Sequence, residues 1–351
     1  MNESSAPSIA ARGRAPEFHP IQLCEHLDGA AAAWPDRMIY HSEEWVRFVA
    51  ETQGATPVRA ELREGGGVLG RVIGLVFTRF GVRIFGSPFA GWTTLYMGFN
   101  LRPGVPRWRG LEALRRFVFK DLGCLYYEIV DRHLTVEDGR RLGLPNGHVE
   151  SYETDLTQSE DAIFGAMESA CRRCIRKAEK SGVTIEEAGE DGFAEEYYGQ
   201  LKDVFGKQGL VPTYDVDRVR ALIRHLHPTG RLLLLRARDP DGKGIATGIY
   251  PGMNDVAQFW GNASLRSGQQ WRPNEALHWH AMRYWKSRGA RVFDWGGGGT
   301  YKEKYGCRRI LVPRFYEARY PILGRLRDAA QNLVYGRQRL LGWLHSVRSD
   351  T

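Results

Sequence analysis

The sequence has few cysteines, no long apolar run and no sustained heptad pattern. Its five cysteines are odd in number and scattered over 351 residues, which argues against a disulfide scaffold and agrees with a reducing compartment. No segment approaches the roughly 18 consecutive apolar residues of a membrane-spanning helix. The first residues, MNESSAPSIAARGRAPEF, lack the apolar stretch of a secretory signal. These absences predict a cytoplasmic protein.

The sequence does carry an excess of positive charge. It has 49 lysines and arginines against 41 acidic residues, a formal net charge of +8. Such a charge favours partners that carry phosphate, such as coenzyme A, a nucleotide-linked sugar, tRNA or an anionic lipid surface. Charge alone does not choose among them.

The spacing of apolar residues predicts two successive units of helices and strands. The first contains a helix over 41–54, a hairpin whose turn lies at Arg63 to Gly67, a helix over 109–121 and a strand over 124–131. The second contains helices over 161–180, 192–207, 215–227 and 273–289, with strands over 183–188, 231–238, 245–250, 256–264, 291–295 and 310–318. The order predicts an α/β (α+β) fold with two tandem units, each a mixed, mostly antiparallel sheet flanked by helices.

The expected domains are 1–35 as a disordered or extended segment, 36–150, 151–318, and 319–351 as a basic amphipathic helix. A weak similarity between the two halves supports duplication of one unit, because a predicted helix, a glycine and a predicted strand lead to both Asp131 and Asp294. The apolar face of the last helix packs on its own protein or forms a peripheral membrane or partner contact through 320–348. The sequence leaves these alternatives open.

The joint between the strand over 256–264 and the next helix is the first candidate site. A helix start presents unpaired N–H groups, which bind phosphate with little help from side chains. The loop SLRSGQQWRP adds Arg266, Gly268 and Arg272 at this point. An ordinary strand-to-helix loop is the alternative, because no phosphate fingerprint is present.

A strongly basic helix is the second candidate. In CRRCIRKAEKSGV, basic side chains that include Arg172, Arg176 and Lys177 lie beside an apolar stripe that contains Cys171 and Cys174. The cysteines are therefore expected to be buried, and no metal site is predicted. The basic face is either a solvated surface or a cradle for an anionic ligand.

The run FDWGGGGTYKEKYG is the third candidate. It lacks the spacing of a nucleotide-binding P-loop. Its glycines, beginning at Gly296, permit close backbone approach to a ligand, and Lys302 and Lys304 follow at once.

These stretches resemble one family. IRKAEKSGV, WGNASLRSGQQWRPNEALHWHAMRYWKSRG and FDWGGGGTYKEKYG are similar to the FemAB and CelD-related branch of the acetyltransferase (GNAT) superfamily. The resemblance implies two GNAT-like domains and transfer of an acyl or aminoacyl group to an amine, from acyl-CoA or aminoacyl-tRNA as co-substrate and with no permanently bound cofactor. The family's proline and asparagine at the helix start match Pro273 and Asn274, which implies a binding role for Asn274. The long coiled-coil arm of the aminoacyl-ligase members is absent, which favours the arm-less members.

Attack on a thioester or ester requires a proton acceptor and donors to the developing oxyanion. Asp294 is the first candidate for the proton acceptor and His278 the second. Backbone N–H groups near Trp260 and the side chain of Asn262 are expected to meet the oxyanion. Lys302 and Lys304 are expected to bind a phosphate or carboxylate of the acceptor. Tyr214 is expected to line the pocket that holds the acceptor.

The predicted protein is thus a cytoplasmic N-acyltransferase of cell-envelope, polysaccharide or specialised-metabolite biosynthesis, with peripheral contact to the inner membrane as an open alternative. Its partners are an anionic donor and an amine-bearing acceptor, with tRNA among the candidate donors and no DNA. The alternative from another class is a non-catalytic binding module for a nucleotide-linked precursor, tRNA or a protein.

Overall fold

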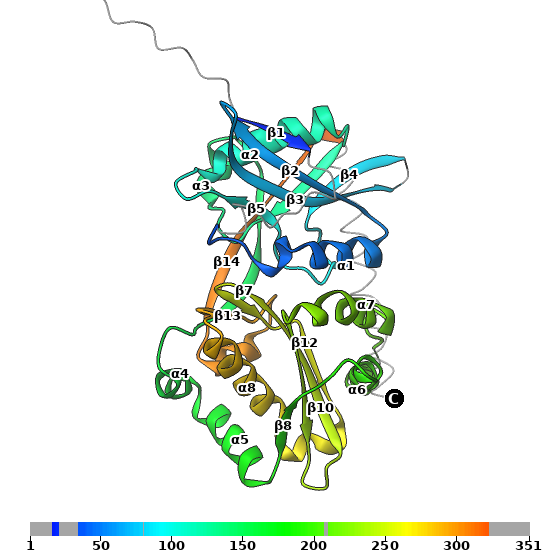
Figure 1. Cartoon of the computed structure of the whole chain (residues 1–351), viewed down its shortest axis with the longest axis vertical. Coiled ribbons are helices and arrows are strands. Elements are labelled where there is room, and N and C mark those ends of the chain that lie inside the picture. Colours follow the sequence, from blue (N-terminus) through cyan, green and yellow to red (C-terminus); the bar gives the residue numbers. More distant parts are fainter. Residues whose placement is uncertain (1–15, 21–33, 80, 207–209, 323–351) are drawn as a thin grey trace, which may run out of the picture.

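A computed structural model describes residues 16–20, 34–79, 81–206 and 210–322 (Figure 1). The strands of the first half are β1 (Glu17–Pro20), β2 (Thr56–Glu64), β3 (Gly67–Arg79), β4 (Val82–Ser87), β5 (Gly98–Leu101) and β6 (Tyr126–Val130). Its helices are α1 (Glu43–Gln53), α2 (Arg107–Arg116), which continues into the π-helical turn η3 (Phe117–Asp121), and α3 (Val136–Arg140). Within the predicted N-terminal segment, the described residues form β1, which pairs with β2.

The second half begins with β7 (Asn146–Asp155). Its helices are α4 (Glu160–Ala166), α5 (Ser169–Lys180), α6 (Phe193–Gly206), α7 (Val216–Leu226) and α8 (Pro273–Ser287). Its strands are β8 (Thr184–Glu187), β9 (Leu232–Arg238), β10 (Gly244–Met253), β11 (Val256–Gln258), β12 (Gly261–Ser264), β13 (Val292–Asp294) and β14 (Arg308–Ala318). None of the described helices is long and apolar enough to cross a membrane.

The described strands form one mixed sheet of fourteen strands. Its order is β1-β2-β3-β4-β6-β14-β7-β13-β11-β10-β9-β8, with β5 beside β3 and β12 beside β10. The pairs β4–β6 and β11–β13 are parallel, and the other described pairs are antiparallel. The predicted fold class, a mixed and mostly antiparallel sheet flanked by helices, is therefore confirmed (Figure 1).

The two halves repeat one arrangement. In the first, β3 pairs with both β4 and β5, α2 follows, and β6 lies parallel to β4. In the second, β10 pairs with both β11 and β12, α8 follows, and β13 lies parallel to β11. Each parallel strand leads to a buried acid, Asp131 or Asp294. The weak similarity between the two halves of the sequence thus corresponds to a repeat in the structure.

Strand β14 joins the halves. Its residues Arg308–Phe315 pair with β7, while Arg314–Ala318 pair with β6 of the first half. One buried cluster also contains Trp45 and Phe48 of α1 together with Leu222 and Leu226 of α7. The division into domains at 150 and 318 stays a prediction, and β14 belongs to both halves by its pairing.

The single helix predicted over 161–180 is wrong, because the chain turns between α4 and α5. Met167 has an extended backbone, and the Arg172 guanidinium donates to the carbonyls of Gly165 and Met167 at 2.5 and 2.6 Å. These carbonyls therefore bond to a side chain instead of to the next helical turn. Cys171 is buried as predicted, whereas Cys174 is half-buried.

The packing of β14 on the first half can be tested at Gly139. A Cβ at this position in α3 would lie 1.9 Å from Cε1 of the buried Phe315 of β14. We expect Gly139→Ala to lower the free energy of unfolding by about 1–3 kcal/mol, although alanine favours helix.

The matched control is Gly199→Ala in α6, where a Cβ would meet nothing within 4 Å. It should raise the free energy of unfolding by about 0.5–1 kcal/mol. Urea denaturation measures both variants, and equal effects would contradict the close packing of Phe315 on Gly139.

Candidate active site at the parting of two strands

Strands β11 and β13 part at the centre of the second half. They pair in parallel from Val256↔Val292 to Gln258↔Asp294, and the Phe259 N–H donates to the Asp294 carbonyl at 2.8 Å. Beyond this point β12 stays with β10, while the Trp295 N–H donates to the Tyr152 carbonyl of β7 at 2.8 Å.

Asp294 lies at the point of parting and is fully buried. Its Oδ1 accepts from the Ser151 hydroxyl at 2.6 Å and from the Gly296 N–H at 2.8 Å. Within the described residues its Oδ2 has no hydrogen-bond partner. Burial raises the pKa of Asp294, and the bonds from Ser151 and Gly296 offset part of that rise. The site therefore holds a carboxyl oxygen that can accept a proton.

Other buried polar atoms surround Asp294 without partners. Among the described side chains these are both amide atoms of Gln258, which pairs with Asp294 across β11 and β13, and the Tyr96 hydroxyl. Tyr96 lies close enough to Asp294 for the carboxyl charge to raise its pKa, although burial is the larger cause. Since unpaired buried polar groups are costly, their concentration at one point indicates a place for a polar ligand or water.

Sequence analysis missed Gln258, Tyr96 and Ser151. Gln258 offered a signal, because it is a polar residue in the otherwise apolar run VAQFW and proves to be buried. Tyr96 offered none, since it comes from the loop between β4 and β5 and reaches the site only through the packing of the two halves.

Lys302 is the buried cation of the site, with 4% of its surface exposed. Its Nζ donates to the carbonyls of Gly296 and Gly297 at 2.8 and 2.5 Å, directly after β13. It also lies 5.9 Å from the centre of the Phe259 ring, directly after β11. Burial lowers the pKa of Lys302 to about 8, and the charge of Asp294 opposes this shift. Lys302 thus contacts segments on both sides of the parting.

The start of α8 is organised by asparagines. Asn262 donates from its side chain to the Asn274 side chain at 2.9 Å, and Asn274 donates to the Ser264 hydroxyl at 3.2 Å. Arg272 precedes the helix in the left-handed region with φ 57°, and no side chain caps the helix. Asn262 and Asn274 therefore meet at this helix start, and their predicted roles in binding stay predictions.

Two groups near this helix start already hold carboxylates. The Arg266 N–H donates to the Asp203 carboxylate at 2.8 Å, and Lys304 forms an ion pair with Glu275 at 2.7 Å. A phosphate at the same place would have to compete with these carboxylates or bind beside them. Trp260 also differs from expectation. Its backbone N–H donates to the Ile249 carbonyl and is therefore not free to donate to an oxyanion.

His278 lies in an aromatic core. It is 2% exposed, its Nδ1 is 3.0 Å from the Tyr250 hydroxyl, and the rings of Phe259, Trp295 and Tyr305 pack around it. Burial lowers its pKa to about 3, so the ring is neutral at physiological pH.

The basic helix α5 makes local contacts. Arg172 bonds to the end of α4 as described above, and the Arg176 guanidinium lies 5.3 Å from the centre of the Phe164 ring. Lys177 is exposed. No described contact joins these three side chains to Asp294, so their predicted role in donor binding stays a prediction.

Tyr214 lines a cavity of about 560 Å³ between α1 and the segment that leads into α7. Its hydroxyl lies 2.8 Å from that of Tyr197, and its ring is 5.4 Å from the ring of Trp260. Tyr214 thus lines a cavity, and its predicted role in the acceptor pocket stays a prediction.

Comparisons with known proteins agree with this geometry. Residues 166–305 match the model of the acetyltransferase (GNAT) domain family. FemX is similar in structure at 14% identity with a TM-score of 0.70, over 88% of this chain and 99% of FemX. A tandem GNAT protein from the clavulanic acid biosynthesis pathway is similar at 11% identity with a TM-score of 0.50, over 87% of this chain and 99% of that chain.

L-PGS from Bacillus licheniformis is similar at 11% identity with a TM-score of 0.50, over 83% of this chain and 96% of that chain. At these identities the likeness shows a shared fold. No curated protein matches the sequence.

The domain match identifies residues 166–305 as an acetyltransferase (GNAT) domain. The likeness to FemX is one of fold, and it agrees with the resemblance that the motifs of the second half indicated.

Proposed function

We propose that the protein transfers an acyl or aminoacyl group from an acyl-CoA or an aminoacyl-tRNA to an amine, in cell-envelope, polysaccharide or specialised-metabolite biosynthesis. One observation carries the proposal: the buried Asp294 has an unpaired carboxyl oxygen where β11 and β13 part. Lys302 supports it, because this buried cation contacts both sides of the same parting.

In the proposed reaction the acceptor nitrogen attacks the carbonyl carbon of the donor. A C–N bond forms, the C–S or C–O bond of the donor breaks, and the amine loses a proton to Oδ2 of Asp294. The raised pKa of Asp294 suits a group that must bind this proton.

Lys302 stabilises the developing oxyanion in this mechanism. An ammonium has three N–H donors, and two of those on Lys302 are used by the carbonyls of Gly296 and Gly297. The third can donate to the oxyanion, and the same ammonium can supply the proton that the leaving sulfur or oxygen takes up. With a pKa of about 8, Lys302 is mostly protonated at neutral pH.

The acceptor approaches through the cavity lined by Tyr214. Tyr214 on the wall of that cavity packs against Trp260, which lies two residues after Gln258 in the chain. A polar acceptor that reaches Asp294 would pair Gln258 and Tyr96 when it binds, which would offset the cost of leaving them unpaired.

The donor class can be identified by thermal denaturation of the full chain with acyl-CoA thioesters and with charged tRNA. The cognate donor should raise Tm, since a ligand at 100 times its Kd stabilises by about 2.7 kcal/mol. With an amine acceptor, the same donor should release free thiol or uncharged tRNA. Stabilisation without release would contradict the proposed transfer and favour a binding module.

A further inference from the structure

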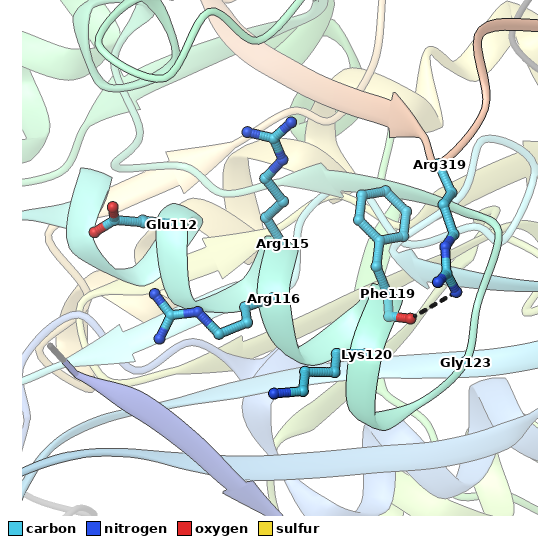
Figure 2. A pocket seen from close by; sticks show the side chains of 7 residues that line it. All are labelled: Glu112, Arg115, Arg116, Phe119, Lys120, Gly123 and Arg319. Carbon is cyan, nitrogen blue, oxygen red and sulfur yellow. Dashed lines mark hydrogen bonds between the residues drawn. The ribbon is translucent and has the colours of Figure 1, made fainter.

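A basic pocket of about 510 Å³ lies in the first half of the chain (Figure 2). Four of its lining residues are cationic, namely Arg115, Arg116, Lys120 and Arg319, and one, Glu112, is acidic. None of these residues belongs to the transfer site described above.

The π-helical turn η3 shapes this pocket. α2 ends at Arg116 and the chain continues into η3, so Arg116 and Lys120 extend in the same direction from neighbouring turns (Figure 2). Arg319 follows the end of β14 and donates from its guanidinium to the Phe119 carbonyl at 3.1 Å. Interruptions of this kind in α-helices occur frequently at functional sites.

The positive charge of the pocket is only partly balanced. Arg115 pairs with Glu317 at 2.6 Å, whereas the carboxylate that pairs with Arg116, from Glu17, is 3.7 Å away. Lys120 has no ionic or hydrogen-bond partner among the described residues. Like charges in such proximity repel one another, and an anion bound between them would relieve that repulsion.

Exposed apolar side chains follow the pocket directly in the chain. Tyr320 is 51% exposed and Ile322 is 66% exposed, and the Arg319 guanidinium lies 5.8 Å from the centre of the Tyr320 ring. Cations beside an exposed tyrosine and an exposed aliphatic residue are typical of protein surfaces at the membrane–water interface.

We propose that this pocket binds the phosphate headgroups of an anionic lipid surface, with Tyr320 and Ile322 entering the interface beside them. Arg116 and Lys120 supply the charge that phosphate requires, and the exposed pair supplies apolar contact. This binding is separate from acyl transfer, so either proposal can fail without the other.

The test is co-sedimentation of the full chain with vesicles of phosphatidylcholine alone or mixed with phosphatidylglycerol. The charge-reversal variant is Arg116→Glu with Lys120→Glu. Its control, Lys243→Glu with Arg288→Glu, makes the same change in net charge at exposed positions in the second half. A third variant, Tyr320→Ser with Ile322→Ser, removes the apolar contact, and Tm confirms that each variant folds.

We expect binding to the anionic vesicles only. It should weaken by at least about 30-fold in the pocket variant, since each of the two basic residues contributes about 1 kcal/mol near an anionic surface and the added negative charges are repelled by it. The control should bind within about 3-fold of wild type, because its charges lie away from the pocket, and the serine variant should bind more weakly than wild type.

Several results would overturn the proposal. These are equal binding to neutral vesicles, equal losses in the pocket variant and its control, and loss of binding only when residues 323–351 are deleted. A rise in Tm with inorganic phosphate that needs Lys120, without vesicle binding, would reject the lipid surface and assign the pocket to a soluble phosphate ligand.

Discussion

Asp294→Asn should lower kcat/KM for acyl transfer by about 10²- to 10⁴-fold, which is the range for loss of a general base. The amide keeps an oxygen for the bonds from Ser151 and Gly296. It cannot accept the proton that the unpaired Oδ2 receives in the proposed mechanism. Because the substitution also removes an acid from a fully buried place, Tm should stay the same or rise.

The internal repeat supplies a matched control in Asp131. This buried acid also follows a parallel strand, but both of its oxygens are occupied. Oδ2 accepts from the Phe99 N–H at 2.7 Å and from Arg107 at 2.6 Å, and Oδ1 accepts from the His133 N–H at 2.8 Å. Asp131→Asn should therefore lower the free energy of unfolding by about 1–3 kcal/mol and leave the activity of the folded enzyme unchanged.

The pH dependence of stability gives a further measure of Asp294. The folded-state pKa of Asp294 is raised, so the native state binds its proton more readily than the unfolded state. The contribution of Asp294 to stability therefore falls as pH rises through that pKa, and Asp294→Asn should remove this dependence. Parallel losses of activity and Tm in Asp294→Asn would contradict a catalytic role.

Lys302→Met should lower kcat by about 10²- to 10³-fold, the range for removal of one oxyanion donor. Methionine fills the space of the aliphatic chain and carries no N–H for the oxyanion. The KM for the acceptor should change little, because the lysine acts on charge that develops in the transition state. A change confined to KM would assign Lys302 to acceptor binding, as the sequence analysis predicted for it.

The pH profile gives a second measure of Lys302. Burial lowers its pKa to about 8, so kcat should fall as pH rises above about 8 and the donor loses its proton. Stability should move in the opposite direction. Between about 8 and about 10.5 the unfolded state binds more protons than the native state, and the free energy of unfolding therefore rises with pH. Lys302→Arg should abolish the alkaline loss, since arginine stays charged there.

Local sequence signals predicted most elements well. The helix that starts after Ser42 ends at Gly54 as predicted, because Ser42 caps its N-terminus and Gly54 adopts a left-handed conformation. The hairpin around Gly65 and Gly66 and the helix that begins at Pro273 also agree. The break at Met167 was missed, because it depends on a side-chain bond from Arg172, which no periodicity reveals.

The sequence by itself determined the resemblance to a GNAT domain in the second half, the order of most helices and strands, and the location of Asp294 at the end of a strand. These features depend on caps, turns and alternation within a few neighbouring residues. Only the tertiary structure decided that β14 joins both halves, that Glu275 neutralises Lys304, and that Tyr96 and Gln258 face Asp294. Such contacts join residues far apart in the chain, and burial and pairing of their side chains exist only after the halves have packed.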